Sequence, residues 1–259
     1  MKQYIIDAFT HVPGAGNPAA VCILGRWPTD ESMQALARKN NLSETAFLVK
    51  EGDFWHLRWF TPETEEVLCG HATLASAYVI LNYVEPERTE VLFTGRSGVL
   101  RVTRRGDLYE MDFPAYAPRE IPVTDAMAEA FGIRPKKALL TLDLTCIFEK
   151  EDEIRHMVPD QSLLASLPGR GQNVTAPGRD YDCVSRSFFP KDGIPEDPVC
   201  GSAHCQILPY WADVLGRSEL TAFQASARGG VLYGKCKENG RILLAGEAVP
   251  EIIEEIDLM

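Results

Sequence analysis

The sequence lacks the features of a membrane protein, a zinc protein and a nucleic-acid-binding protein. No apolar run approaches the length of a membrane-spanning helix, and the apolar part of MKQYIIDAF is too short for a signal peptide. No CxxC pair occurs, so a structural zinc site has no support. Basic residues number 26 against 37 acidic ones, and a net charge of −11 would repel a phosphate backbone. We therefore expect no membrane, metal or nucleic-acid partner.

The cysteines also lack the pattern of a disulfide framework. Seven is an odd number, and without an export signal it indicates reduced thiols in a cytoplasm. A length of 259 residues, 45% of them hydrophobic and 24% charged, is typical of a soluble globular protein large enough for two lobes. We expect a cytoplasmic protein with two lobes.

The order of the patterns indicates an α+β fold. Apolar stretches at 69–84 and 200–215 predict helices, and Pro209 should bend the second one. In the second half, strands are expected at about 138–149, 153–158 and 181–189. The segment 113–122 holds three prolines and interrupts the patterns around it, so it predicts the boundary between the lobes.

The motif CGxA occurs once in each half. CGHA at 69–72 and CGSA at 200–203 each open a predicted helix, which indicates an internal duplication. A helix N-terminus offers unpaired N–H groups to a carboxylate, and Gly70 and Gly201 would let a ligand approach the backbone closely. Each glycine alone could simply permit a tight turn, but the repetition of the motif favours two helix N-termini that bind an anion.

The helix openings carry three further reactive side chains. A helix terminus lowers the pKa of a thiol, so Cys69 and Cys200 could act as bases, although free cysteines are also common buried residues. The helix dipole disfavours an imidazolium at His71, so a neutral ring near pH 7 is expected. His204 and Cys205 follow one turn after Cys200, but no fourth ligand completes a tetrahedron, and a metal is not expected.

Two carboxylates stand at junctions between polar and apolar sequence. Glu44 lies in NLSETAFLV, where a polar helix end becomes an apolar strand, and a partly shielded carboxyl suits general acid–base chemistry. A surface glutamate at a strand start is the commoner reading. Asp197 lies in EDPVCGS, where an Asp-Pro turn is the default explanation.

Five segments together resemble the PhzF-like family, which is named for the isomerase of phenazine biosynthesis and shares the diaminopimelate epimerase fold. They are DAFTHVPGAGNPAAV, NNLSETAFLV, LRWFTPETEEVLCGHATLASAYV, RSFFPKDGIPEDPVCGSAHCQILPYWA and QASARGGVLYG. In this order and spacing they run from residue 7 to about 234, which is nearly the whole chain.

The resemblance implies two pseudo-symmetric lobes, each an antiparallel sheet wrapped around a central helix. An N-terminal lobe of 1–115 plus about 247–259 and a C-terminal lobe of 116–246 would hold the active site between them. The resemblance also implies a homodimer without a metal, flavin or pyridoxal cofactor. The family's acid–base glutamate falls on Glu44, and its other site residues fall on Gly70, His71, Asp197, Gly201 and Ser202.

The chain departs from the family at Cys200, where threonine is common. Thiols at both helix N-termini resemble those of the two-base racemases and epimerases of the same fold.

The sequence leaves three readings of the function. The first is a cofactor-independent isomerase that moves a proton on a small carboxylate-bearing substrate with Glu44. The second is a racemase or epimerase that uses Cys69 and Cys200. The third is a non-catalytic binding or scaffold protein of the same fold. No motif contains a lone Arg or Lys that would indicate a second anionic group on the substrate.

Overall fold

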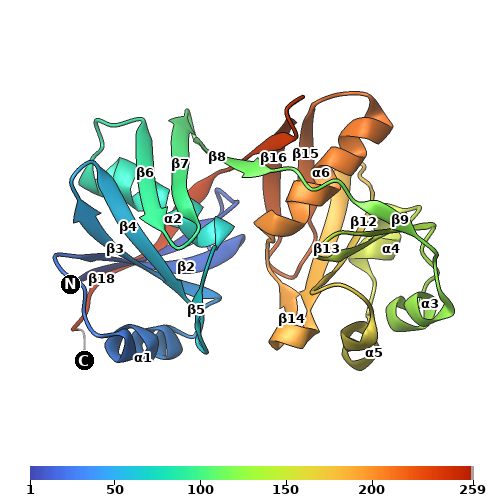
Figure 1. Cartoon of the computed structure of the whole chain (residues 1–259), viewed down its shortest axis with the longest axis horizontal. Helices are drawn as coiled ribbons and strands as arrows, with labels where there is room; N and C mark the ends of the chain where they lie inside the picture. The colour runs from blue at the N-terminus through green and yellow to red at the C-terminus, as the bar shows by residue number, and fades with distance from the viewer. Residues whose placement is uncertain (258–259) are drawn as a thin grey trace. The chain divides into compact units, whose positions relative to one another are not determined.

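The computed structural model describes residues 1–257, and the chain forms two compact units (Figure 1). Unit 1 comprises Met1–Asp112 and the described residues from Ala245 onward, and unit 2 comprises Phe113–Leu244. Residues 258 and 259, which the predicted segment 247–259 includes, lie outside the described residues. Within that described range, no helix is both long and apolar enough to cross a membrane.

Unit 1 is a mixed sheet with two helices and one helical extension. Its elements are β1 (Lys2–Ala8), β2 (Asn17–Leu24), α1 (Asp30–Asn40), β3 (Glu44–Glu51), β4 (Phe54–Phe60), β5 (Glu65–Glu66), α2 (Gly70–Val79), the π-helical turn η1 (Ile80–Val84), β6 (Glu90–Gly95), β7 (Gly98–Arg105), β8 (Leu108–Pro114) and β18 (Ala248–Glu255). β1 pairs antiparallel with both β2 and β18, so the last described strand completes the sheet of the first unit.

Unit 2 repeats this arrangement with additional short helices. Its elements are β9 (Arg119–Ile121), α3 (Asp125–Phe131), β10 (Lys137–Leu140), β11 (Leu144–Ile147), α4 (Glu151–Arg155), α5 (Gln161–Ser166), β12 (Gln172–Pro177), β13 (Cys183–Phe189), η2 (Pro190–Asp192), β14 (Ile194–Asp197), α6 (Gly201–Leu215), β15 (Glu219–Gln224), β16 (Gly230–Cys236) and β17 (Arg241–Gly246). The chain leaves unit 1 within β8 and returns to it within β17.

The two units share one order of strand pairing. In unit 1, β1–β2 is antiparallel, β2–β3 parallel, β3–β4 and β4–β5 antiparallel, β4–β6 parallel and β6–β7 antiparallel. In unit 2, the strands from β10 to β16 follow the same order with β10–β11 as the first pair. α2 and α6 occupy the same crossover in their units. The predicted two-lobed, pseudo-symmetric α+β fold is confirmed.

The sheets are mixed, whereas the resemblance implied an antiparallel sheet in each lobe. Among the strand pairs of the described residues, parallel ones include β2–β3, β4–β6, β11–β12 and β13–β15. A parallel pair needs a long crossover connection, and in each case that connection contains a helix. Each parallel pair therefore depends on a crossover connection that contains a helix of the same unit.

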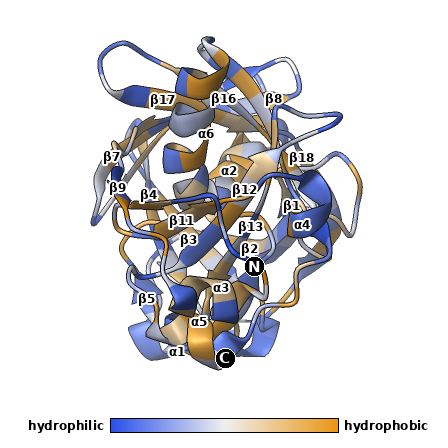
Figure 2. Cartoon of the chain, turned by 90° about the vertical axis from the view of Figure 1, so that its right-hand side faces the viewer, coloured by the Kyte–Doolittle hydropathy of each residue, from blue (hydrophilic) through white to orange (hydrophobic). Residues whose placement is uncertain are grey.

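The helices differ in how much of their surface is buried. α2 has no Asp, Glu, Lys or Arg and is buried on nearly all sides, as expected of a helix that a sheet surrounds. α1 buries only Met33, Leu36 and Ala37, and its other residues are largely hydrophilic (Figure 2). Its N-cap is Thr29, whose side chain accepts a hydrogen bond from the Ser32 N–H.

α6 runs without interruption through Pro209. Proline has no N–H, so the Cys205 carbonyl four residues earlier loses its helical partner. The backbone N–H of Tyr116 donates to that carbonyl at 2.9 Å. An external donor from the proline-rich segment thus satisfies the acceptor that Pro209 leaves unpaired.

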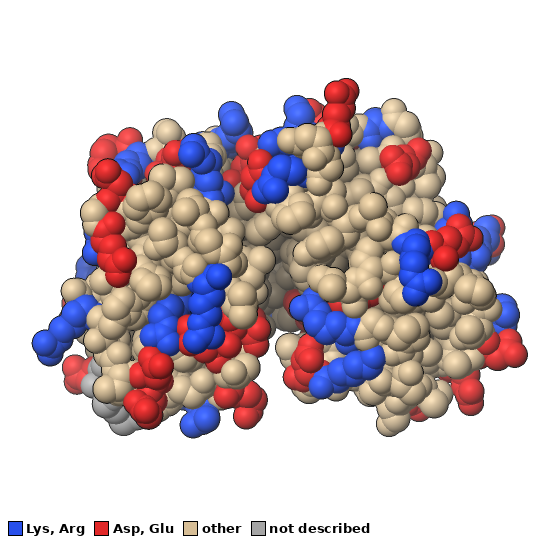
Figure 3. Space-filling model, viewed as in Figure 1, with Lys and Arg blue, Asp and Glu red and all other residues tan. Residues whose placement is uncertain are grey.

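The strand expected at 153–158 is wrong. The segment forms α4 instead, because the Glu153 carboxylate accepts hydrogen bonds from the N–H groups of Glu149 and Lys150 and caps the helix. Ile154 and Met157 then point into the core of unit 2. On the face shown in Figure 3, acidic and basic side chains are interleaved and form no large region of one sign.

Candidate active site

The first cluster of predicted site residues lies at the start of α2. Glu44 is the first residue of β3, and His71 is the second residue of α2. The Glu44 Oε2 and His71 Nε2 atoms form an ion pair at 3.0 Å, with only 15% and 8% of the two side chains exposed. Neither atom has a hydrogen bond within the described residues. Buried polar atoms without such partners are expected where a ligand supplies them.

Cys69 lies on the other side of the His71 ring. Its Sγ is 3.5 Å from His71 Nδ1, so the imidazole stands between a thiol and a carboxylate. Burial raises the pKa of Cys69 to about 11. The expected lowering by the helix terminus is therefore wrong, because the loss of hydration outweighs the helix dipole.

His71 also differs from the expectation of a neutral ring. Burial lowers its pKa, but the acidic groups of Cys69 and Glu44 beside the ring raise it, and the resulting pKa lies well above the usual value. Because the Cys69 thiol stays protonated at neutral pH, the negative charge facing the ring is that of Glu44. The close carboxylate outweighs the helix dipole, and His71 is an imidazolium paired with Glu44.

Glu44, Cys69 and His71 are also the kinds of residue that bind zinc. One donor atom from each lies within 4.8 Å of the others. Ligand atoms of a tetrahedral zinc site lie roughly 3.3–3.6 Å apart, and a histidine uses one ring nitrogen. Here the two ring nitrogens of His71 face different partners. This geometry does not fit a single metal ion bound by all three side chains.

Gly70 separates Cys69 from His71 and faces open space. A Cβ atom added at Gly70 would meet no other atom within 4 Å. The glycine is therefore not required by packing in unit 1, and room for a ligand remains beside the first turn of α2.

The second cluster of predicted residues lies at the start of α6. Ser202 is exposed, and its Oγ lies 3.3 Å from the Cys200 Sγ. Burial raises the pKa of Cys200 well above the usual value, so this thiol also contradicts the expected lowering. Asp197 Oδ1 accepts a hydrogen bond from the Val199 N–H at 3.0 Å, which forms the predicted turn before Gly201.

Gln224 holds the approach to α6 and was missed by the sequence analysis. Its Oε1 accepts from the Cys200 N–H at 2.8 Å, and its Nε2 donates to the Asp197 carbonyl at 2.6 Å. The side chain is fully buried at the end of β15. A single glutamine in QASARGG gave no periodic or motif signal for this role.

His204 has a structural role one turn into α6. Its Nδ1 lies 2.7 Å from the Cys200 carbonyl and its Nε2 lies 3.0 Å from the Ser185 hydroxyl. Burial lowers the pKa of His204 to about 4, so the ring is neutral at pH 7. Nδ1 then donates to the carbonyl, and Nε2 accepts from Ser185.

Arg170 was also missed. Its Nη2 donates to the Ser202 Oγ at 3.3 Å, and its Nε and Nη2 donate to Asp143 at 3.1 and 3.2 Å. Arg170 lies in a short PGRG loop, 32 residues before Ser202. No local sequence pattern links two residues that are so far apart.

The predicted residues thus gather in two groups. Glu44, Cys69, Gly70 and His71 surround the start of α2, and Asp197, Cys200, Gly201 and Ser202 surround the start of α6. Their joint action on one substrate stays a prediction.

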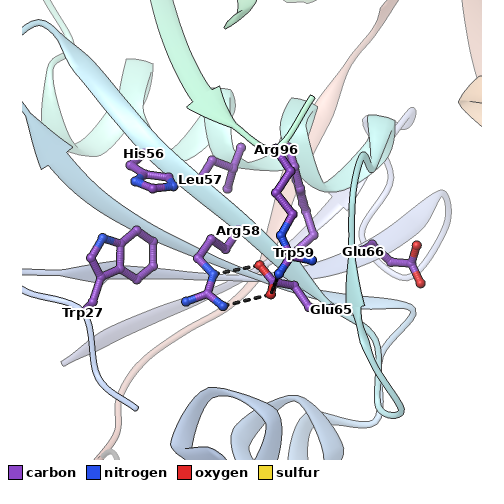
Figure 4. Close-up of a pocket in the computed structure, with 8 residues that line it drawn as sticks. All are labelled: Trp27, His56, Leu57, Arg58, Trp59, Glu65, Glu66 and Arg96. Carbon is purple, nitrogen blue, oxygen red and sulfur yellow. Dashed lines mark hydrogen bonds and ion pairs between the residues drawn. The ribbon is translucent and has the colours of Figure 1, made fainter. Parts of the chain in front are cut away.

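A separate cavity of about 200 Å³ lies on unit 1 beside β4 and β5 (Figure 4). Glu65 accepts hydrogen bonds from Arg58 at 2.7 and 2.8 Å and pairs with Arg96 at 2.8 Å. Trp27 packs against Arg58. The cations of this cavity already have an anionic partner, and none of the predicted site residues lines it.

Two units of one topology, each with a buried helix that follows a Cys-Gly pair, define a protein of the diaminopimelate epimerase-like fold. The chain belongs to the phenazine biosynthesis-like protein family, whose model matches residues 6–253. The resemblance found in the sequence is therefore confirmed.

Relatives of known sequence extend over the whole chain. A Pseudomonas aeruginosa protein named as an uncharacterized isomerase is 50% identical over 253 residues, which cover 96% of this chain and 95% of the relative. A Halalkalibacterium halodurans protein with the same description is 42% identical and covers 98% and 97%.

Solved structures agree with this assignment. A PhzF-family phenazine biosynthesis protein of Enterococcus faecalis has a TM-score of 0.97 and 45% identity, with 99% of both chains covered. A hydroxyproline epimerase from Agrobacterium vitis, at a TM-score of 0.60 and 11% identity, covers 98% of this chain and 91% of its own and shares the fold alone.

Proposed function

We propose that this chain is an isomerase that moves a proton on a small carboxylate-bearing substrate without a cofactor, with Glu44 as the general acid–base. The observation that carries the proposal is the Glu44–His71 ion pair at the start of α2, whose facing atoms have no hydrogen bond within the described residues. The names of the relatives as isomerases support the reaction class.

The reaction needs no oxidant or reductant. The Glu44 carboxylate takes a proton from a substrate carbon, and the electron pair of that C–H bond spreads into the unsaturated system joined to the carboxylate. Glu44 then returns the proton to a second carbon. The His71 imidazolium donates a hydrogen bond to the charge that develops, and the low exposure of both side chains strengthens this interaction.

The residues at α6 bind and orient the substrate in this proposal. The first turns of α2 and α6, with Gly70 and Gly201, offer N–H groups to the carboxylate. Asp197 and Ser202 orient polar substituents.

The two-thiol reading has weaker support. A thiol must be ionised to take a proton from carbon, and burial raises the pKa of Cys69 to about 11. At pH 7 about one Cys69 side chain in ten thousand would then be a thiolate. Cys200 is disfavoured in the same way, because burial raises its pKa well above the usual value.

Deuterium exchange tests the role of Glu44. Native protein in D2O, mixed with the small-acid fraction of a bacterial extract, should place deuterium on one acid detected by mass spectrometry. Glu44→Gln keeps the shape of the side chain but removes the base, so labelling should fall at least about a hundredfold. Glu85→Gln is the matched control, because Glu85 is also ion-paired in unit 1 and 17% exposed.

The same assay separates the two enzyme readings. Cys200→Ser should keep labelling within about threefold of the native rate, because the base lies elsewhere. Labelling that survives Glu44→Gln but disappears in Cys200→Ser would show that the thiols are the bases.

We also propose that the protein acts as a homodimer in the cytoplasm. All seven cysteines are free thiols, which fits a reducing compartment. Sedimentation equilibrium at micromolar concentration tests the dimer.

A further inference from the structure

The geometry points to Arg170 as the residue that selects a negatively charged carboxylate on the substrate, with Ser202 as its hydrogen-bonding partner. This inference rests on the proposed function for the presence of a carboxylate. It adds that unit 2 recognises the charge of the substrate through Arg170 and Ser202.

The pseudo-repeat places Arg170 in a position comparable to that of Glu44. His71 and Ser202 are each the second residue of their helix and follow the cysteine by two positions. Glu44 begins β3, and Arg170 lies two residues before β12, which is the equivalent strand of unit 2. Each contacts the second helical residue, at 3.0 Å for Glu44 and His71 and at 3.3 Å for Arg170 and Ser202.

The guanidinium is held in one orientation. Asp143 is buried, receives two hydrogen bonds from Arg170 and accepts a third from the Gly171 N–H at 3.1 Å. The central carbon of the guanidinium lies over the Phe189 ring, 5.0 Å from its centroid. A bidentate pair and a ring contact together fix the planar fork, as expected of an arginine that recognises a carboxylate.

The loop that carries Arg170 is built around two glycines. Gly169 has a φ of +85°, and a Cβ there would lie 2.6 Å from the Leu144 nitrogen. A Cβ at Gly171 would lie 2.2 Å from the Phe189 ring. Lys191 also donates hydrogen bonds to the carbonyls of Leu167 and Gly169. The backbone on both sides of Arg170 is therefore fixed by close packing.

Part of the guanidinium remains accessible. The Arg170 side chain is 51% exposed, and its Nη1 forms no hydrogen bond with the described residues. Ser202 is exposed beside it. An incoming carboxylate could accept from Nη1 and from the Ser202 hydroxyl while Asp143 keeps the fork in place.

A pair of probes of nearly the same shape, one an anion and the other neutral, tests the inference. Binding of 1-cyclohexene-1-carboxylate and of 1-cyclohexene-1-carboxamide to the full-length protein is measured by ligand-observed NMR. Native protein should bind the acid at least about tenfold more tightly than the amide, because the acid accepts charge-assisted hydrogen bonds. Arg170→Gln keeps a donor for Asp143 but loses the charge, and the preference should fall several-fold toward the smaller value that the helix N–H groups alone provide.

Two variants make the result specific. Arg170→Lys retains the charge without the planar fork and should restore part of the preference. Arg134→Met is the matched control, because Arg134 is 56% exposed and ion-paired in the same unit, and the preference should stay at the native value. If native protein shows no preference for the acid, or Arg170→Gln keeps it, the inference is overturned.

Failure of the proposed function gives a different result. If Glu44→Gln still labels substrate at the native rate, Glu44 is not the base. A charge preference that depends on Arg170 would nevertheless remain, because the binding measurement involves no proton transfer.

Discussion

At the scale of single residues, burial and close charges decide protonation more strongly than the helix termini do. The sequence analysis located Cys69, His71 and Cys200 at helix starts, but it assigned all three protonation states from the dipole. Loss of hydration raises both thiol pKa values, and the acidic groups of Cys69 and Glu44 raise that of His71. These interactions depend on tertiary contacts that spacing along the chain does not reveal.

The charge of His71 gives a pH dependence of stability. Its pKa is raised in the folded state, so the ion pair stabilises the fold fully below the unfolded value of about 6.5. This contribution is lost as the pH rises through the folded-state pKa. The difference in unfolding free energy between native protein and His71→Gln should therefore shrink as the pH increases above 6.5. Urea denaturation at a series of pH values measures it.

His204 is the control for this measurement. Its folded-state pKa is lowered to about 4, so its neutral ring contributes stability that is present above pH 6.5 and lost as the pH falls toward 4. Above pH 6.5 the difference between native protein and His204→Gln should be constant. A His71 difference that is also constant there would show that His71 is neutral in the folded state.

At the scale of elements, local sequence patterns predicted the positions of the helices, but they did not predict all of the residues that contact the helices. The predicted helices at 69–84 and 200–215 correspond to α2 with its extension η1 and to α6, and Thr29 caps α1. The strand predicted at 153–158 is a helix because Glu153 caps it. Gln224 and Arg170 were missed since their partners lie 24 and 32 residues away.

A substitution at the start of α2 tests directly whether a substrate approaches the backbone there. Gly70→Ala places a methyl group in space that no atom within 4 Å occupies, so packing should not change. Alanine favours helix over glycine by up to about 1 kcal/mol, and thermal unfolding should show equal or higher stability. If a substrate approaches this backbone, deuterium labelling should nevertheless fall at least about tenfold.

Gly25→Ala is the matched control for Gly70→Ala. A Cβ at Gly25 also meets no atom within 4 Å, but this glycine lies just after β2, outside both clusters. Its labelling rate should equal that of native protein. Unchanged labelling in Gly70→Ala would place the substrate away from the first turn of α2.

At the scale of the whole molecule, the repeated motif CGxA was the strongest guide. It indicated two related halves, and the shared order of strand pairing confirms them. The mixed character of the sheets was not predicted, because strand direction follows from which connections cross over and not from alternation within a strand. The last strand returns to unit 1, which links the two ends of the chain in one sheet.

This return of β18 predicts how a truncated protein behaves. β18 and β1 are registered over seven residue pairs, the Glu247 carbonyl accepts from the N–H groups of Phe9 and Thr10, and the Met1 amino group donates to the Ile256 carbonyl. A chain that stops at Gly246 would leave β1 as an open edge with unpaired backbone groups. Each lost hydrogen bond costs about 0.5–1.5 kcal/mol, and the sum approaches the roughly 5–15 kcal/mol that stabilises a whole domain.

Unit 1 of the truncated chain should therefore unfold or aggregate, while unit 2 keeps its own sheet. Hydrogen exchange followed by mass spectrometry distinguishes the two outcomes, because amides of β2 and β3 should lose protection and amides of β12 and β13 should keep it. The single substitution Glu251→Ala, at an exposed position of β18, should leave both sets protected. Retained protection of β2 and β3 in the truncated chain would mean that unit 1 does not depend on its C-terminal strand.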